Sequence, residues 1–415
     1  MSKAAVDSAA QKFLALTAAH LAPYLEACVH CGQCAEACHF YEVSKDSRHT
    51  PAYKLFPIAR AYKRSKSPLN WIGVTKTVSE KELAEWEELI FDTCTMCGRC
   101  TTICPMGIDI AAAVAATRQA YVAAGLGPAD LMEAAENVRE HGSPLKVSPQ
   151  VLEERLEWIA DEADTEIPLD KKGAEILFTI SSIELMKYPS SVGAMAKLLN
   201  AAGVNWTISK KGYEATNFGY LSGKADIARL GLTRVVNAAE ELGIKEVIIP
   251  ECGHAYSVMR WNGANILGRP LPFSVLHITE YLAKLKREGK LKFNPIEDKI
   301  TYHDPCQVSR RGGAEADARY LIDGFAPNFR EMAPTANYNW CCGGGGGVQA
   351  IARAAPLRHK VFEIKAEQVE KSGADMMVSS CANCRLTMDE SIEALNWGGK
   401  LESLVELLAD NVIKA

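Results

Sequence analysis

The stretch CVHCGQCAEAC, from Cys28 to Cys38, places four cysteines with two, two and three residues between them. The stretch CTMCGRCTTIC, from Cys94 to Cys104, repeats this spacing. Runs of this kind bind [4Fe–4S] clusters, with the first three thiolates on one cluster and the fourth on a second cluster. Zinc ribbons use separate pairs of cysteines instead. The sequence therefore predicts two cubane clusters in this part of the chain.

Because the fourth cysteine of each run binds the cluster of the other run, the expected ligand sets combine the two runs. We assign one cubane to Cys28, Cys31, Cys34 and Cys104, and the other to Cys94, Cys97, Cys100 and Cys38. The first run departs from the usual pattern, because His39 follows Cys38 whereas Pro105 follows Cys104. Proline at this place shapes the turn and is not a ligand, so we expect iron binding to survive with a changed potential.

Helical periodicity surrounds both cysteine runs, and no strand is expected before about residue 170. The expected helices cover residues 4–25, 54–65, 80–91, 109–124 and 148–161. The polar stretch 161–173 contains Pro168 and two lysines, which indicates a domain boundary. We therefore expect residues 1–165 to form an α-helical, ferredoxin-like electron-relay domain with two [4Fe–4S] clusters.

After this boundary, β-rich runs alternate with helices in two successive units, 174–290 and 298–415, which predicts a duplicated α/β domain. The expected strands cover 175–180, 205–209, 246–250, 299–303, 329–333 and 375–379, and the expected helices 191–202, 225–242, 315–324 and 356–371. The ends of the units align, LGIKEVIIPECGHAY with SGADMMVSSCANCRL. Cys252 thus matches Cys381, and Ala255 stands where Cys384 stands.

Five further cysteines lie in the second unit: Cys306, the adjacent pair Cys341 and Cys342, and then Cys381 and Cys384. Their stretches YHDPCQ, WCCGGGGG and SSCANC resemble the cysteine-rich CCG domain of heterodisulfide-reductase-type proteins. The resemblance implies that the five thiolates hold one non-cubane [4Fe–4S] cluster. Two adjacent thiolates suit an opened cluster, and helix starts supply N–H donors to its negative charge.

Together with the two-cluster region, this resemblance covers nearly the whole chain. It points to the D-type heterodisulfide reductase subunit and to the similar K-type subunit of cytoplasmic sulfite-reduction-associated complexes, with the glycolate oxidase iron–sulfur subunit as a related branch. It implies an oxidoreductase subunit that relays electrons through two cubanes to the non-cubane cluster. That cluster would catalyse disulfide or polysulfide reduction, or thiol oxidation, within a respiratory complex.

The alternative function is electron transfer alone, within a flavin-dependent 2-hydroxyacid (glycolate or lactate) dehydrogenase complex. The implied partners are a membrane cytochrome or quinone subunit, or a flavoprotein, and a thiol or persulfide carrier protein. The glycines at 343–347 match neither a phosphate-binding loop nor a dinucleotide fingerprint. We therefore expect no flavin or NAD in this chain, and electrons enter or leave through a partner.

The first unit departs from the family, because it lacks the cysteines of a second non-cubane cluster. Ser181 and Ser182 stand at the strand end that matches Cys306, and residues 214–219 contain no cysteine pair. Cys252 remains as a candidate catalytic, substrate-facing thiol, an extra ligand or an inert buried thiol. His254 is a candidate proton donor to a leaving thiolate, or else a helix cap or packing residue.

Other residues are expected near the non-cubane cluster. Gly343 and Gly344 would let the backbone approach cluster sulfurs without a Cβ clash. Arg310, with Arg311, would hold an anionic substrate or balance the cluster charge, unless the two form a solvated turn. His303 is expected to be structural and to hydrogen-bond groups next to the cluster ligands.

Composition limits the remaining classes. The chain has 46 basic and 51 acidic residues and a net charge of −5, so we expect no nucleic acid partner. No segment resembles an export signal or a membrane span, and C-x-x-C groups in a reducing compartment are more often metal sites than disulfides. We expect a cytoplasmic protein, or one that lies on the cytoplasmic membrane face through a partner.

Overall fold

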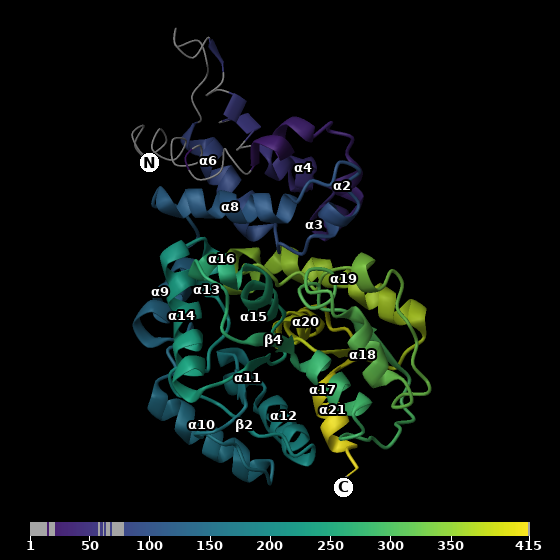
Figure 1. Ribbon diagram of the computed structural model, residues 1–415. Coiled ribbons are helices and arrows are strands. Elements are labelled where there is room, and N and C mark those ends of the chain that lie inside the picture. Colours follow the sequence, from purple (N-terminus) through teal and green to yellow (C-terminus); the bar gives the residue numbers. More distant parts are fainter. Residues whose placement is uncertain are drawn as a thin grey trace.

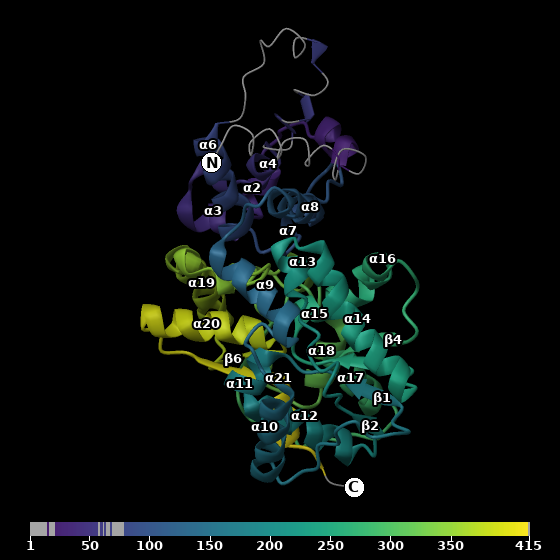
Figure 2. The same ribbon diagram turned by 90° about the vertical axis from the view of Figure 1, so that its left-hand side faces the viewer.

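The computed structural model describes residue 15 and residues 21–56, 59–60, 62–63, 67–68 and 79–413. The helix expected over 4–25 falls largely outside these ranges, although residues 21–27 are helical. The helix expected over 54–65 lies partly outside them. Figures 1 and 2 show a block of helices (α2, α3, α4, α6, α8) at one end of the molecule and an α/β body at the other.

Short polar caps start the longer helices of this block. Ser79 and Glu82 form a capping box at the start of α6 (Glu80–Glu87), which continues as a π-helical turn, Glu88–Asp92. Asp109 accepts a hydrogen bond from the Ala112 amide and starts α8 (Ile110–Ala123). The remaining helices before the body are α2 (Gln33–Glu36), α3 (His39–Ser44), α4 (Pro51–Lys54), α7 (Arg99–Thr102), α9 (Ala129–His141) and α10 (Pro149–Glu162).

The first sheet of the body is parallel and has the order β2-β1-β3-β4. Ile176 of β1 lies between Trp206 of β2 and Glu246 of β3. The strands are β1 (Ile176–Phe178), β2 (Trp206–Thr207), β3 (Glu246–Ile249) and β4 (Ser274–His277). The connecting helices are α11 (Ser182–Lys187), α12 (Pro189–Ala201), α13 (Phe218–Ser222), α14 (Ala225–Leu242), α15 (Gly253–Ser257), α16 (Gly263–Leu267) and α17 (Ile278–Arg287), with a π-helical turn at Val258–Asn262.

The second sheet is also parallel and has the order β5-β6-β7. The strand expected over 329–333 is absent: among the described residues, its one ladder-like bond runs from the Arg330 amide to the Ile300 carbonyl. Pro334, which has no N–H, ends that run. The elements are β5 (Ile300–His303), β6 (Met376–Ser379), β7 (Lys400–Ser403), α18 (Glu315–Ile322), α19 (Ala355–Ser372), α20 (Ala382–Leu395) and α21 (Leu404–Asp410).

The helical block is fixed to the body by a shared apolar core and by one buried arginine. Phe40 and Phe91 of the block belong to the same buried cluster as Val348 and Val361 of the body. The guanidinium of Arg118 donates to backbone carbonyls of both parts: Ile90, Phe91, Cys94, Leu221 and Gly346. Among the described helices, none combines the length and the apolar character needed to span a membrane.

Candidate metal centres

The first group of thiols lies in the helical block. Gly32, with φ of 82°, precedes α2 and turns the chain so that Cys34 points inward. Burial raises the pKa of Cys34, and the neighbouring thiols of Cys28, Cys31 and Cys104 raise it further. Cys31 is exposed, whereas Cys34 is buried. The four cysteines that the spacing predicts as one ligand set therefore lie together, at the surface of the molecule.

The second group has the equivalent arrangement. Gly98, with φ of 75°, precedes α7 as Gly32 precedes α2. Burial raises the pKa of Cys100 well above its ordinary value, and the thiols of Cys97, Cys94 and Cys38 add to this effect. The fourth cysteine of the first run thus lies with the first three of the second run.

A buried lysine accompanies the second group. Lys54 is 2% exposed, and its Nζ lies 3.8 Å from Cys38 Sγ and donates to the Thr93 carbonyl. Burial lowers the pKa of Lys54, but the nearby thiols, Cys38 foremost, outweigh burial and raise it. Within the described part of the chain Lys54 has no carboxylate ion-pair partner. Because a buried cation needs an opposite charge, this donor set suits an anionic iron–sulfur cluster.

The third group contains the five cysteines of the second unit, and all five are buried. Cys306 follows β5, Cys381 caps α20, and Cys384 lies in the first turn of that helix. Cys306 Sγ lies 3.9 Å from Cys341 Sγ. Hydrogen bonds between close thiols lower the pKa of Cys341 and of Cys342 and raise the pKa of their partners, Cys306 and Cys384. Within each close pair one sulfur therefore favours the thiolate, which is the form that binds metal.

Two buried basic side chains lie beside the third group. Lys365 is fully buried and donates to Gln368 Oε1 at 2.8 Å and Met332 Sδ at 3.5 Å, and burial lowers its pKa to about 8. No ion pair to a carboxylate is found for it among the residues that the structure describes. His303 is also fully buried, and a ring nitrogen lies within 4.8 Å of the Cys342 and Cys384 sulfurs.

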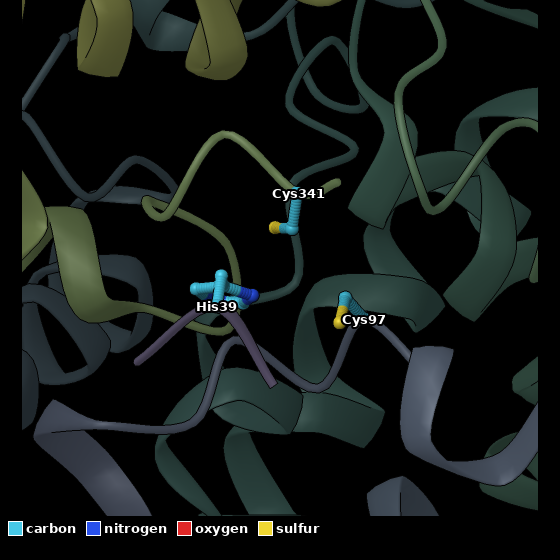
Figure 3. Close-up of side chains that lie close together, drawn as sticks. All are labelled: His39, Cys97 and Cys341. Carbon is cyan, nitrogen blue, oxygen red and sulfur yellow. The ribbon is translucent and has the colours of Figure 1, made fainter. Parts of the chain in front are cut away.

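The second and third groups meet where the helical block touches the body. Cys97 of the block, Cys341 of the body and His39 have ligand atoms within 4.8 Å of one another. Figure 3 shows these three side chains close together. Cys341 Sγ also lies 3.5 Å from Thr95 Oγ1. The two groups are therefore neighbours, although the chain separates them widely.

The glycine run packs closely against neighbouring protein atoms. A Cβ on Gly344 would lie 1.8 Å from Thr387 Oγ1, and one on Gly346 would lie 2.8 Å from the Thr95 carbonyl carbon. The run is thus packed between the body and the helical block. Two of its amides also contact thiols: the Gly343 amide lies 3.5 Å from Cys341 Sγ, and the Gly344 amide donates to Cys342 and lowers the pKa of that thiol.

The two arginines after Cys306 join the two parts of the molecule. Arg310 donates to the carbonyls of Cys97, Asn337 and Asn339. Arg311 forms an ion pair with Asp109 at 3.1 Å. Both therefore lie beside the second thiol group, and their expected role toward an anionic substrate or the cluster charge stays a prediction.

Cys252 lies opposite the third group. It caps α15 after β3, as Cys381 caps α20 after β6, and it is 6% exposed. The Ala382 amide donates to the Glu251 carbonyl at 2.7 Å, so the two turns face each other. Burial raises the pKa of Cys252, and its Sγ lies 3.4 Å from Thr216 Oγ1.

His254 contacts the glycine run. Its Nε2 accepts a hydrogen bond from the Gly346 amide at 3.1 Å, which leaves Nδ1 as the protonated nitrogen. Burial lowers its pKa to about 4. The neutral ring fixes this loop and is a weak acid for the proton transfer that the sequence suggested.

Comparison with protein families finds two matches. Residues 24–108 match the 4Fe-4S dicluster domain, and residues 300–389 match the cysteine-rich CCG domain. The D-type subunit of the CoB–CoM heterodisulfide reductase from Methanosarcina barkeri is 28% identical over 394 residues, which cover 93% of each chain. This chain is a homologue of the D-type heterodisulfide reductase subunit. It is an iron–sulfur protein of electron transport with [4Fe–4S] domains.

Two further relatives show the range of complexes that contain such chains. The Hdr-like menaquinol oxidoreductase iron-sulfur subunit of Archaeoglobus profundus is 25% identical over 86% of this chain and 74% of its own length. The EtfAB:quinone oxidoreductase of Syntrophomonas wolfei is 26% identical over 89% of this chain and 55% of its own length. All three relatives are oxidoreductases or their subunits.

In this homologue of the D-type subunit, the sequence motifs located the thiols but missed the buried cations. Lys54 and Lys365 have no motif around them, and their position depends on how helices from separate stretches pack. His39 carried a signal, because it replaces the usual proline, but its contact with the third group could not be read from the spacing.

Proposed function

We propose that this chain relays electrons through two cubane [4Fe–4S] clusters to a non-cubane [4Fe–4S] cluster, where a disulfide or polysulfide is reduced or a thiol oxidised. The observation that carries the proposal is the series of three thiol groups, of which the second and third are neighbours. It runs from exposed Cys31, through the contact of Cys97 with Cys341, to Cys384 inside the body. When bound, the clusters would supply one-electron transfer, while a disulfide needs two electrons.

The ligand and domain assignments belong to this proposal. We assign the cubanes to Cys28, Cys31, Cys34 and Cys104, and to Cys38, Cys94, Cys97 and Cys100; the non-cubane cluster to Cys306, Cys341, Cys342, Cys381 and Cys384. Residues 1–165 would form the relay domain, and 174–290 and 298–415 the two halves of the CCG domain. The equivalent caps formed by Cys252 and Cys381 support the duplication.

Cys252 is proposed as the thiol that faces the substrate. Thr216, which contacts Cys252, also lines a cavity of about 590 Å³ between α9, α14 and the loop before α13. This volume is suited to a small molecule. Because burial raises the pKa of Cys252, its thiol is protonated at neutral pH and would contact the substrate sulfur as a neutral thiol, while solvent would supply the protons that the released thiolates take up.

The overall reaction takes two electrons and two protons and converts one disulfide into two thiols, or runs in reverse. A membrane cytochrome or quinone subunit, or a flavoprotein, would exchange the electrons, and a thiol or persulfide carrier would be the substrate. The relatives named as quinone or menaquinol oxidoreductases support a redox complex of this kind.

Addition of a thiol or disulfide to the oxidised, cluster-loaded protein tests the catalytic role. We expect the electron paramagnetic resonance signal of the third cluster to change, as it would if a substrate sulfur reached it. An unchanged signal would contradict catalysis here and favour the alternative, an electron-transfer subunit of a flavin-dependent 2-hydroxyacid dehydrogenase complex.

Cys252→Ser separates the proposed thiol from the cluster. We expect this variant to lose disulfide turnover and to keep its iron, because serine fits the same space but offers the substrate no sulfur. Thr216→Val removes only the hydroxyl that contacts Cys252 Sγ, and since Thr216 also lines the cavity, it should reduce turnover less than Cys252→Ser does. Unchanged turnover in Cys252→Ser would remove Cys252 from the mechanism.

A further inference from the structure

His39 is a buried side chain whose polar atoms have no partner in the described structure. It is the first residue of α3, it is 2% exposed, and its ring packs on Phe40 with centroids 4.4 Å apart. Neither ring nitrogen has a protein hydrogen-bond partner that meets ordinary geometry. Buried polar groups are nearly always hydrogen-bonded, and an unsatisfied one destabilises the folded state. The ring must therefore have another acceptor in the working protein.

The surroundings of His39 identify that acceptor by its chemistry. A ring nitrogen lies within 4.8 Å of the sulfurs of Cys97 and Cys341, which come from the helical block and the body (Figure 3). Under the proposed function, Cys97 binds the second cubane and Cys341 the non-cubane cluster. The acceptors at this junction are thus ligand or cluster sulfurs that carry negative charge.

We infer that His39 donates an N–H···S hydrogen bond at the junction of the second and third clusters and raises their reduction potentials. A histidine ring has at least one N–H in either protonation state, so the donor is always present. A donor to sulfur stabilises the reduced, more negative cluster more than the oxidised one. His39 is a positioning residue here, and this inference depends on the cluster assignments made above.

Two substitutions remove the donor in different ways, so that at least one can keep the fold. His39→Pro restores the residue that usually follows the fourth cysteine, and proline is well tolerated at the first position of a helix. His39→Phe keeps an aromatic ring against Phe40. His39→Gln retains an N–H donor and tests rescue.

A matched control uses the histidine beside the first group. His30 is exposed, and its Nδ1 lies 3.9 Å from Cys28 Sγ. It has φ of 53°, a conformation that asparagine adopts readily, so His30→Asn should preserve the turn. Because His30 lies beside the first group and is exposed to solvent, its loss should leave the potentials of the second and third clusters unchanged.

The test is an anaerobic redox titration of the full, cluster-loaded chain, followed by electron paramagnetic resonance, with metal content measured on the same samples. We expect His39→Pro and His39→Phe to shift both junction clusters to more negative potentials with iron unchanged, and His39→Gln to restore most of the shift. His30→Asn should move neither potential.

Unchanged potentials in a fully loaded His39→Pro or His39→Phe protein would overturn the inference. Loss of a metal ion in these variants would also overturn it, since His39 would then be a ligand rather than a donor. The titration contains no thiol substrate, so its result is independent of whether the third cluster proves to be catalytic.

Discussion

Lys54 shows how a single buried charge reports on the group beside it. A lysine is almost never fully buried without a partner of opposite charge. Its Nζ contacts Cys38 Sγ and the Thr93 carbonyl, so the counter-charge must come from the second thiol group. The side chain therefore acts as a fixed positive charge for whatever those thiolates bind.

We expect Lys54→Met to weaken the second cluster. Removal of a buried counter-charge costs about 3 kcal/mol, so iron should leave the loaded protein faster and the cluster potential should fall. Release of iron to a chelator, followed by absorbance, measures the first effect. Lys45→Met is the control. Lys45 is the C-cap residue of α3, is exposed, and forms an ion pair with Glu42 of the same helix. Equal release rates for the two variants would contradict this role.

At this scale the sequence predicts which thiols lie together but not what surrounds them. The spacing of the cysteines groups Cys34 with Cys104, which lie far apart in the chain, because the ligand geometry of a cluster constrains the loop. No such constraint marks Lys54 or Lys365, since a lysine in an amphipathic stretch is ordinarily a solvated residue. The contacts of Arg310 and Arg311 were not predictable for the same reason, because their partners come from other segments.

Among the elements, α17 depends on an unusual cap. His277 is fully buried, its Nδ1 accepts from the Thr279 amide at 3.3 Å, and burial lowers its pKa to about 3. The unfolded chain titrates this histidine near 6.5, so below that pH the unfolded state binds a proton that the folded state excludes. The stabilising effect of the neutral cap is present above pH 6.5 and is lost as the pH falls.

We expect His277→Asn to remove this pH dependence, because asparagine caps a helix without titrating. Between pH 7.5 and 5.5 the wild type should lose about 1.4 kcal/mol more of its free energy of unfolding than the variant does. Anaerobic urea denaturation followed by circular dichroism at the two pH values measures the difference. Parallel losses in the two proteins would show that His277 is not held neutral.

Strong hydrophobic periodicity predicted the long helices, but the short edge strands were not predicted. The helix at α14 was expected with the bounds that it has, 225–242. The edge strands β4 and β7 have four residues each, with mixed exposed and buried positions, and give little signal. The run at 329–333 looks like a strand, but Arg330 is its one point of backbone pairing with β5.

Over the whole molecule, the three thiol groups differ in their access to solvent. Cys31 is exposed in the first group, Cys97 is buried in the second, and all five cysteines of the third are buried. The exposed group therefore forms the end of the series that a protein partner can reach.

A bulky anaerobic iron chelator should remove the first cluster before the others. We expect a fast phase that releases about a third of the iron and abolishes the signal of one cubane, followed by much slower loss of the rest. Iron release and electron paramagnetic resonance on the same samples follow the two phases. Cys31→Ser should accelerate the fast phase alone. Simultaneous loss of all three signals would contradict the gradient of access.

The sequence predicted a relay region followed by a cysteine-rich domain, but it could not show how the two are joined. Thr95 and Cys341 are 246 positions apart, and no spacing rule connects them. Their contact results from the core shared by the helical block and the body, and from the carbonyl bonds of Arg118.

The buried position of Cys97 against Cys341 also constrains how the protein matures. Once the helical block has closed on the body, Thr95 packs against the glycine run and Cys341. Under the proposed ligand assignment, we expect the second cluster to be inserted while the two parts are still apart. Docking of the two parts would then be the last step of biogenesis, and it would seal the cofactors inside.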